Sequence, residues 1–81
     1  MERNFGDVYR KILEIAPEEL KEKLENKLSF AAPEVAWSVL SRCVNDTIRP
    51  SSEDPLSIKI YAILLGCSED DMKARFEFDG I

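Results

Sequence analysis

The sequence predicts an all-α fold, a compact bundle of four to five short helices forming a single domain over residues 1–81. Three observations predict it. Apolar residues recur at the three- and four-residue spacing of amphipathic helices. Prolines in "APEEL", "APEVA" and "DPLSI" stand where helices begin, because the first helical turn needs no proline N–H. Only one stretch, "LSIKIYAILL", resembles a strand, and no second β-rich run could pair with it.

The first two helices are expected over about residues 4–15 and 17–28. Asn4 is placed to cap the first one. In the second, only a narrow stripe of leucines is apolar, and Glu19 and Lys23 have the spacing of an ion pair. We therefore expect the second helix to lie on the surface. The first helix buries one face, which carries Phe5, Val8, Tyr9, Ile12, Leu13, Ile15 and Ala16.

The third and fourth helices, about residues 33–48 and 55–65, are the most apolar parts of the chain. The fourth has only Ser57 and Lys59 as polar interruptions. A helix that is apolar all round must be covered on every side, and we expect a chain of 81 residues to leave part of this surface uncovered. The fifth helix, about residues 69–77, should start at Ser68 after a left-handed stop at Gly66. Residues 77–81 are expected to fray.

The corner between the fourth and fifth helices resembles a known family. Ala62 and Gly66 have the spacing of a helix-turn-helix corner, and "LGCSED" follows the Leu-Gly-x-Ser-x-Asp pattern. Over about residues 55–76 the chain resembles the closing helices of phage repressor-like regulators, including the lambda CII-type activators. The resemblance implies that this corner is structural and that an earlier helix pair reads DNA. The corresponding segment here lacks a glycine corner, and its candidate DNA-binding residues are Arg42, Asn45, Thr47 and Arg49.

Composition argues against several functions. The chain has no histidine and only two cysteines, Cys43 and Cys67, too few ligands for a structural zinc. No nucleophile motif or glycine-rich phosphate loop is present. We therefore expect the protein to bind no metal or cofactor and to have no enzymatic activity. The net charge of −5 opposes attraction to nucleic acid. The longest apolar run is far shorter than a membrane span, and we expect a soluble, cytoplasmic protein with reduced cysteines.

The excess apolar surface predicts a small acidic module that acts by binding another protein, or a second copy of itself as a homodimer. The alternative is a divergent helix-turn-helix regulator that binds DNA. Acidic residues at the start of the fifth helix would rim the docking surface and steer basic partners. The predicted partner-binding residues are Trp37, Val44, Ile48, Tyr61, Leu65, Glu69, Asp70 and Asp71.

Overall fold

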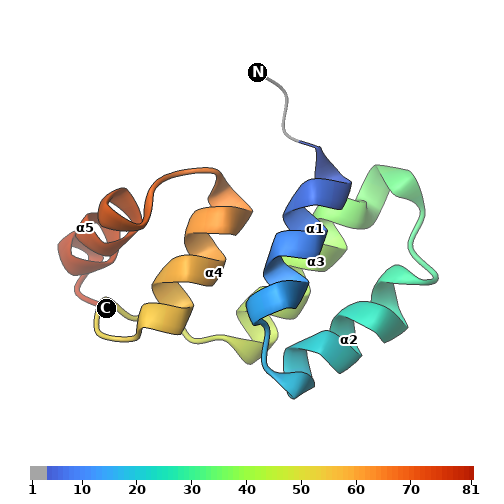
Figure 1. The fold of residues 1–81 in the computed structure, drawn as a ribbon, viewed down its shortest axis with the longest axis horizontal. Helices are drawn as coiled ribbons and strands as arrows, with labels where there is room; N and C mark the ends of the chain where they lie inside the picture. Colours follow the sequence, from blue (N-terminus) through green and yellow to red (C-terminus); the bar gives the residue numbers. More distant parts are fainter. Residues whose placement is uncertain (1–3) are drawn as a thin grey trace.

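The computed structural model describes residues 4–81, which form five α-helices and one short 3-10 helix (Figure 1). The described residues contain no strand, so the all-α prediction and the helical reading of "LSIKIYAILL" are confirmed. Residues 1–3 of the predicted domain lie outside the described part. The elements are α1 (Phe5–Ile15), α2 (Glu18–Leu28), η1 (Pro33–Val35), α3 (Ala36–Thr47), α4 (Pro55–Leu65) and α5 (Glu69–Asp79).

Side-chain caps fix where α1 and α5 begin. The Asn4 Oδ1 accepts a hydrogen bond from the N–H of Asp7, and the Ser68 Oγ accepts one from the N–H of Asp71. Each bond satisfies a first-turn donor that has no partner inside the helix. At the C-terminal end of α4, Gly66 has φ of 76° and its N–H donates to the Ala62 carbonyl. The predicted caps and the glycine stop are confirmed.

Two predicted helix ends differ from the structure. Residues 33–35 form a 3-10 turn ahead of α3, so the predicted third helix is divided in two. The C-terminal segment does not fray: α5 continues to Asp79, and the Ile81 N–H donates to the Phe76 carbonyl. The Ile81 carbonyl also accepts a hydrogen bond from the N–H of Ser52. A loop far away in the sequence therefore holds this end, which the local pattern could not reveal.

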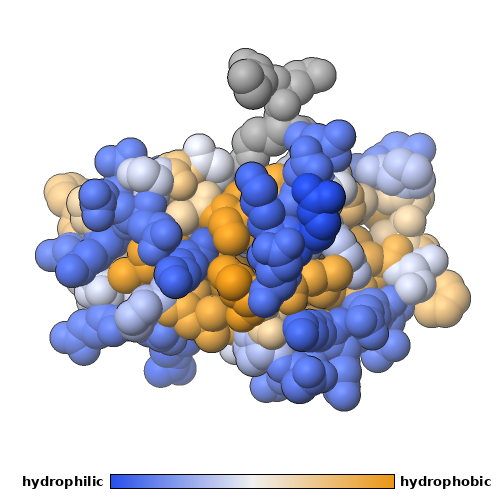
Figure 2. Space-filling model, viewed as in Figure 1, coloured by the Kyte–Doolittle hydropathy of each residue, from blue (hydrophilic) through white to orange (hydrophobic). Residues whose placement is uncertain are grey.

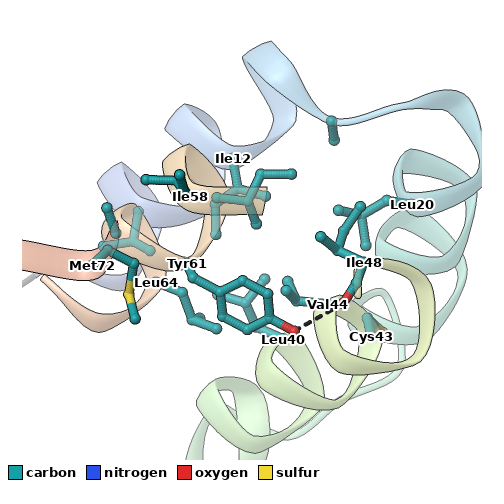
Figure 3. Packing of buried hydrophobic residues seen from close by; sticks show 14 of the residues in the cluster. Ile12, Leu20, Leu40, Cys43, Val44, Ile48, Ile58, Tyr61, Leu64 and Met72 are labelled. Carbon is teal, nitrogen blue, oxygen red and sulfur yellow. Dashed lines mark hydrogen bonds between the residues drawn. The ribbon is translucent and has the colours of Figure 1, made fainter. Parts of the chain in front are cut away.

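The helices pack in pairs, two of which include α4. The closest pairs are α1 with α4, α4 with α5, and α2 with α3. Figure 1 shows α5 at one end of the long axis and α2 at the other, with α1, α3 and α4 between them. The molecule measures 35 × 31 × 20 Å. One continuous core joins these pairs (Figure 3), and its fully buried side chains include Ile12, Leu20, Leu24, Leu40, Val44, Ile60 and Met72.

Candidate functional site

Three of the predicted partner-binding residues lie in the core. Val44 is 0%, Ile48 7% and Tyr61 6% exposed, so the prediction that they form a docking surface was wrong. Tyr61 is buried because α4 packs against α1 and α5, and Val44 and Ile48 are buried because they belong to the same core on the α3 side, where α2 packs against α3. Figure 3 shows the Tyr61 ring reaching from α4 toward α3. On α4, Tyr61 is therefore buried, whereas Leu65 is 49% exposed.

Tyr61 joins α4 to α3 through its polar end. Its hydroxyl is 2.9 Å from both the Asn45 Oδ1 and the Ile48 carbonyl oxygen, and it donates to these two acceptors. Its ring packs edge-on against Phe76, with 5.6 Å between centroids. Burial raises the pKa of the Tyr61 phenol above its usual value. Tyr61 is thus a structural joint between three helices, which explains its burial.

The candidate DNA-binding residues differ in their exposure. The Asn45 side-chain oxygen is occupied by the Tyr61 hydroxyl. The Thr47 Oγ1 is buried and has no hydrogen-bond partner. Arg42, Asn45 and Arg49 are exposed, and Arg42 and Asn45 border one hollow. Of the four, only Thr47 is not exposed.

The acidic residues Glu69, Asp70 and Asp71 are exposed in the first turn of α5. Figure 1 places α5 beyond α4, at the end of the molecule opposite α2. Trp37 lies on α3, so the acidic turn does not rim the surface around it. The predicted arrangement of an apolar patch with an adjacent acidic rim was wrong for Trp37, because α4 lies between α3 and α5.

Large apolar side chains are exposed at other places. Half of these exposed apolar residues lie within one short segment, residues 30–37, which runs from the end of α2 to the start of α3. Of the predicted residues, only Trp37 and Leu65 belong to the set. Its members are Phe30 (91% exposed), Val35 (46%), Trp37 (37%), Leu65 (49%), Phe78 (91%) and Ile81 (47%).

The segment at residues 30–37 borders a groove between α2 and α3, which we call the α2–α3 groove. Its volume is about 450 Å³. The exposed Phe30 and Val35 belong to its lining. Among the described residues that line it, the charged ones are Lys27 and Arg42, and both are cationic. The lining consists of Lys27, Phe30, Ala31, Val35, Ser38, Val39, Arg42 and Cys43.

Trp37 also lies on α3, but it is not part of the lining of the α2–α3 groove. Its ring packs edge-on against Phe5 of α1, with 5.1 Å between centroids. The outer part of the ring borders a second hollow that shares Ser38 and Arg42 with the α2–α3 groove. Trp37 is therefore partly core and partly surface, and its exposed edge is close to the groove.

Cys43, the cysteine in the groove lining, is a structural rather than a reactive thiol. It is buried and free, and its Sγ lies 4.0 Å from the Lys23 carbonyl oxygen. Burial raises the pKa of the Cys43 thiol, and the neighbouring Asp46 raises it further while Lys27 opposes the rise. A raised pKa lowers the fraction of thiolate, which is the nucleophilic form. Within residues 4–81, no three metal-ligating side chains gather into a site.

A second apolar strip lies where α1 meets α4, and Figure 2 shows it along the middle of one face. A hollow there is bordered by Ile15, Ile63 and Cys67, with Lys11 and Lys59 beside them. These three apolar side chains are half-buried and pack against the core. By contrast, Phe30 at the α2–α3 groove stands almost fully in solvent.

Sequence reasoning missed Phe30 and Phe78, the two most exposed aromatic residues. Phe30 lies between helices, where helical periodicity has no meaning, and Phe78 lies in the segment expected to fray. One signal was available for Phe30. A bulky aromatic residue in the short connection "SFAAP", next to a proline-started helix, has few neighbours to cover it.

Comparison of the chain with protein-family models, with curated proteins and with solved structures finds no match. Among the described helices, none combines the length and the apolar character needed to cross a lipid bilayer.

Proposed function

We propose that the chain is a small non-enzymatic module that binds a partner protein through the α2–α3 groove. The observation that carries the proposal is Phe30, a phenylalanine 91% exposed on the edge of the α2–α3 groove. Burying such a side chain contributes about 1.5–3 kcal/mol. A partner that covers it gains this free energy, and aromatic anchors in pockets often dominate protein interfaces.

The charges around the groove support one class of partner. The chain is acidic overall, with a net charge of −5, yet Lys27 and Arg42 line the groove. A partner segment with an apolar anchor and neighbouring carboxylates would satisfy both the hollow and its cations. Complementary charges of this kind select partners and speed their association. The groove thus favours an acidic segment, whereas the sequence alone suggested a basic partner for the acidic turn of α5.

The experiment selects peptides from a random library on the immobilised protein and measures the affinity of the purified peptides. Fluorescence of Trp37, the only tryptophan, reports binding because its ring borders the neighbouring hollow. We expect peptides with an aromatic residue between acidic residues, and Phe30→Ser should weaken their binding by about tenfold or more. Leu65→Ser is the matched control: Leu65 is a similarly simple exposed apolar residue outside the groove lining, and its loss should leave binding unchanged.

Two results would contradict the proposal. One is that no peptide binds above background. The other is that bound peptides keep their affinity for the Phe30→Ser variant, which would place the binding surface elsewhere. Circular dichroism of both variants checks that the helices are retained.

Binding to DNA is the second candidate function. The turn from Ala62 to Gly66 has the hydrogen bond and the left-handed glycine expected of a helix-turn-helix corner, which supports it. The three acids at the start of α5 oppose it, because phosphate contacts supply most non-specific affinity. Titration of a labelled duplex decides between the two: DNA binding requires affinity at low salt that falls steeply as salt rises, and no binding at any salt excludes this function.

A further inference from the structure

The end of α5 presents an exposed aromatic ring on a hydrogen-bonded stretch of backbone. Phe78 is 91% exposed in the last turn of the helix. On the opposite side of the same helix, Met72 and Phe76 are buried in the core. The hydrogen bonds from the Ile81 N–H to the Phe76 carbonyl and from the Ser52 N–H to the Ile81 carbonyl hold the end of the helix. The backbone that carries the ring therefore loses little conformational freedom when the ring binds, which favours association.

The surroundings of Phe78 are predominantly negative. Glu77 and Asp79 flank it in the sequence, and both are exposed. The carbonyl end of a helix adds partial negative charge at the same place. Arg75, one turn earlier, is the cation on this face. Along the whole of α5, five acids stand against Lys73 and Arg75.

The end of α5 is complementary to the α2–α3 groove in apolar character and in charge. The groove offers an apolar hollow beside Phe30, with Lys27 and Arg42 in its lining, and the end of α5 offers a ring beside Glu77 and Asp79. The two cannot meet within one chain, because they lie at opposite ends of the 35 Å long axis (Figure 1). We propose that the groove of one copy takes the Phe78 end of α5 of a second copy. This inference rests on the proposed function and names the partner.

The geometry of such a contact has a consequence for assembly. Groove and helix end are different surfaces, so the contact is heterologous, and a pair of copies keeps one free groove on one copy and one free Phe78 on the other. Heterologous contacts produce chains of copies or closed rings rather than simple symmetric dimers. A groove of about 450 Å³ takes only a ring and its nearest neighbours. The contact is therefore small, and small contacts are weak.

The first test is sedimentation of the full chain up to about 0.5 mM, a range suited to weak association. The wild type should associate beyond the dimer as its concentration rises. Phe30→Ser and Phe78→Ser should each weaken association by about tenfold or more, while Leu65→Ser should associate like the wild type. Both phenylalanines are 91% exposed, so their replacement leaves the core intact.

Mixing the two defective variants gives the most specific result. Phe30→Ser retains an intact Phe78, and Phe78→Ser retains an intact groove. Neither variant should associate alone, but a mixture should form one-to-one dimers that grow no further. A symmetric interface, in which both phenylalanines are needed on each copy, would not be restored by mixing, and that result would overturn the proposal.

Charge exchange tests the electrostatic part. The double variant Lys27→Glu with Arg42→Glu should abolish association. The double variant Glu77→Lys with Asp79→Lys should abolish it too, although this pair makes the chain less acidic and thereby reduces general repulsion between copies. All four changes together restore opposite charges across the contact and should restore association. Failure of the fourfold variant to associate, when it is folded by circular dichroism, would overturn the charge pairing.

The outcomes also separate this inference from the proposed function. A wild type that stays monomeric at every concentration, yet binds selected peptides in a Phe30-dependent manner, would overturn self-association and leave the protein-binding role standing. Loss of both activities would overturn both.

Discussion

Two buried hydroxyl groups have opposite effects on the domain because one has partners and the other has none. The Ser57 side chain is fully buried, donates to the Arg49 carbonyl at 2.9 Å and accepts from the N–H of Ser51 at 3.1 Å. It thereby ties the connection between α3 and α4 to α4. The Thr47 Oγ1 is buried without a hydrogen-bond partner. Burying an unpaired polar group costs free energy that a paired group avoids.

Removing these two hydroxyls should therefore change stability in opposite directions. Ser57→Ala leaves a backbone carbonyl and an N–H without their partner, and should lower the free energy of unfolding by about 1–3 kcal/mol. Thr47→Val keeps the shape but removes the unpaired oxygen, and should raise it by about 1 kcal/mol. Urea denaturation measures both. Equal losses in the two variants would show that Thr47 has a partner after all.

At the scale of elements, α4 illustrates how a helix without a polar face is placed and ended. Hydrophobic periodicity cannot orient it, because nearly every side is apolar. Its start is set by Asp54, whose Oδ1 accepts from the Leu56 N–H at 3.0 Å, followed by Pro55. Its end is set by Gly66, whose φ of 76° lies in the left-handed region. The termini are thus fixed locally, and the neighbouring helices fix the rest.

Replacement of Gly66 tests the strength of that stop. A Cβ in the left-handed region costs about 1–2 kcal/mol, so Gly66→Ala should lower the free energy of unfolding by about that amount. Asparagine tolerates this conformation better than alanine. Gly66→Asn should therefore lose less than Gly66→Ala in the same urea experiment. If asparagine were as costly as alanine, steric contact rather than backbone conformation would account for the loss.

For the whole molecule, the distribution of charge matters more than its sum. The net charge is −5, but α5 is acidic and carries Phe78, whereas the groove at the other end is lined by Lys27 and Arg42. The molecule therefore has two unlike ends, each with an exposed phenylalanine. This polarity is what makes a head-to-tail association of copies possible.

Buried ionisable groups also make the stability of the whole domain depend on pH. Burial raises the pKa of the Cys43 thiol above 9.0 and that of the Tyr61 phenol above 10.0. The folded state therefore holds these protons more tightly than the unfolded state. Their contribution is fully present below pH 9 and is lost as the pH rises through the raised pKa values.

The free energy of unfolding should accordingly fall as the pH is raised above 9, and fall further above 10. Tyr61→Phe, which cannot ionise, should show a shallower fall above pH 10 than the wild type, although it is less stable at neutral pH. Urea denaturation at a series of pH values measures both slopes. An identical slope in the variant would show that Tyr61 does not contribute.

The sequence by itself determined the helices, since caps such as Asn4 and Ser68 and the stop at Gly66 act within a few residues of themselves. It also determined that α2 lies on the surface, because only one stripe of leucines is apolar. Which apolar residues are covered was decided by the tertiary structure alone. Tyr61, Val44 and Ile48 became core because helices distant in sequence pack on them, while Phe30 and Phe78, at a connection and at a helix end, found no such neighbours. Exposure is a property of the packed assembly, and local spacing does not contain it.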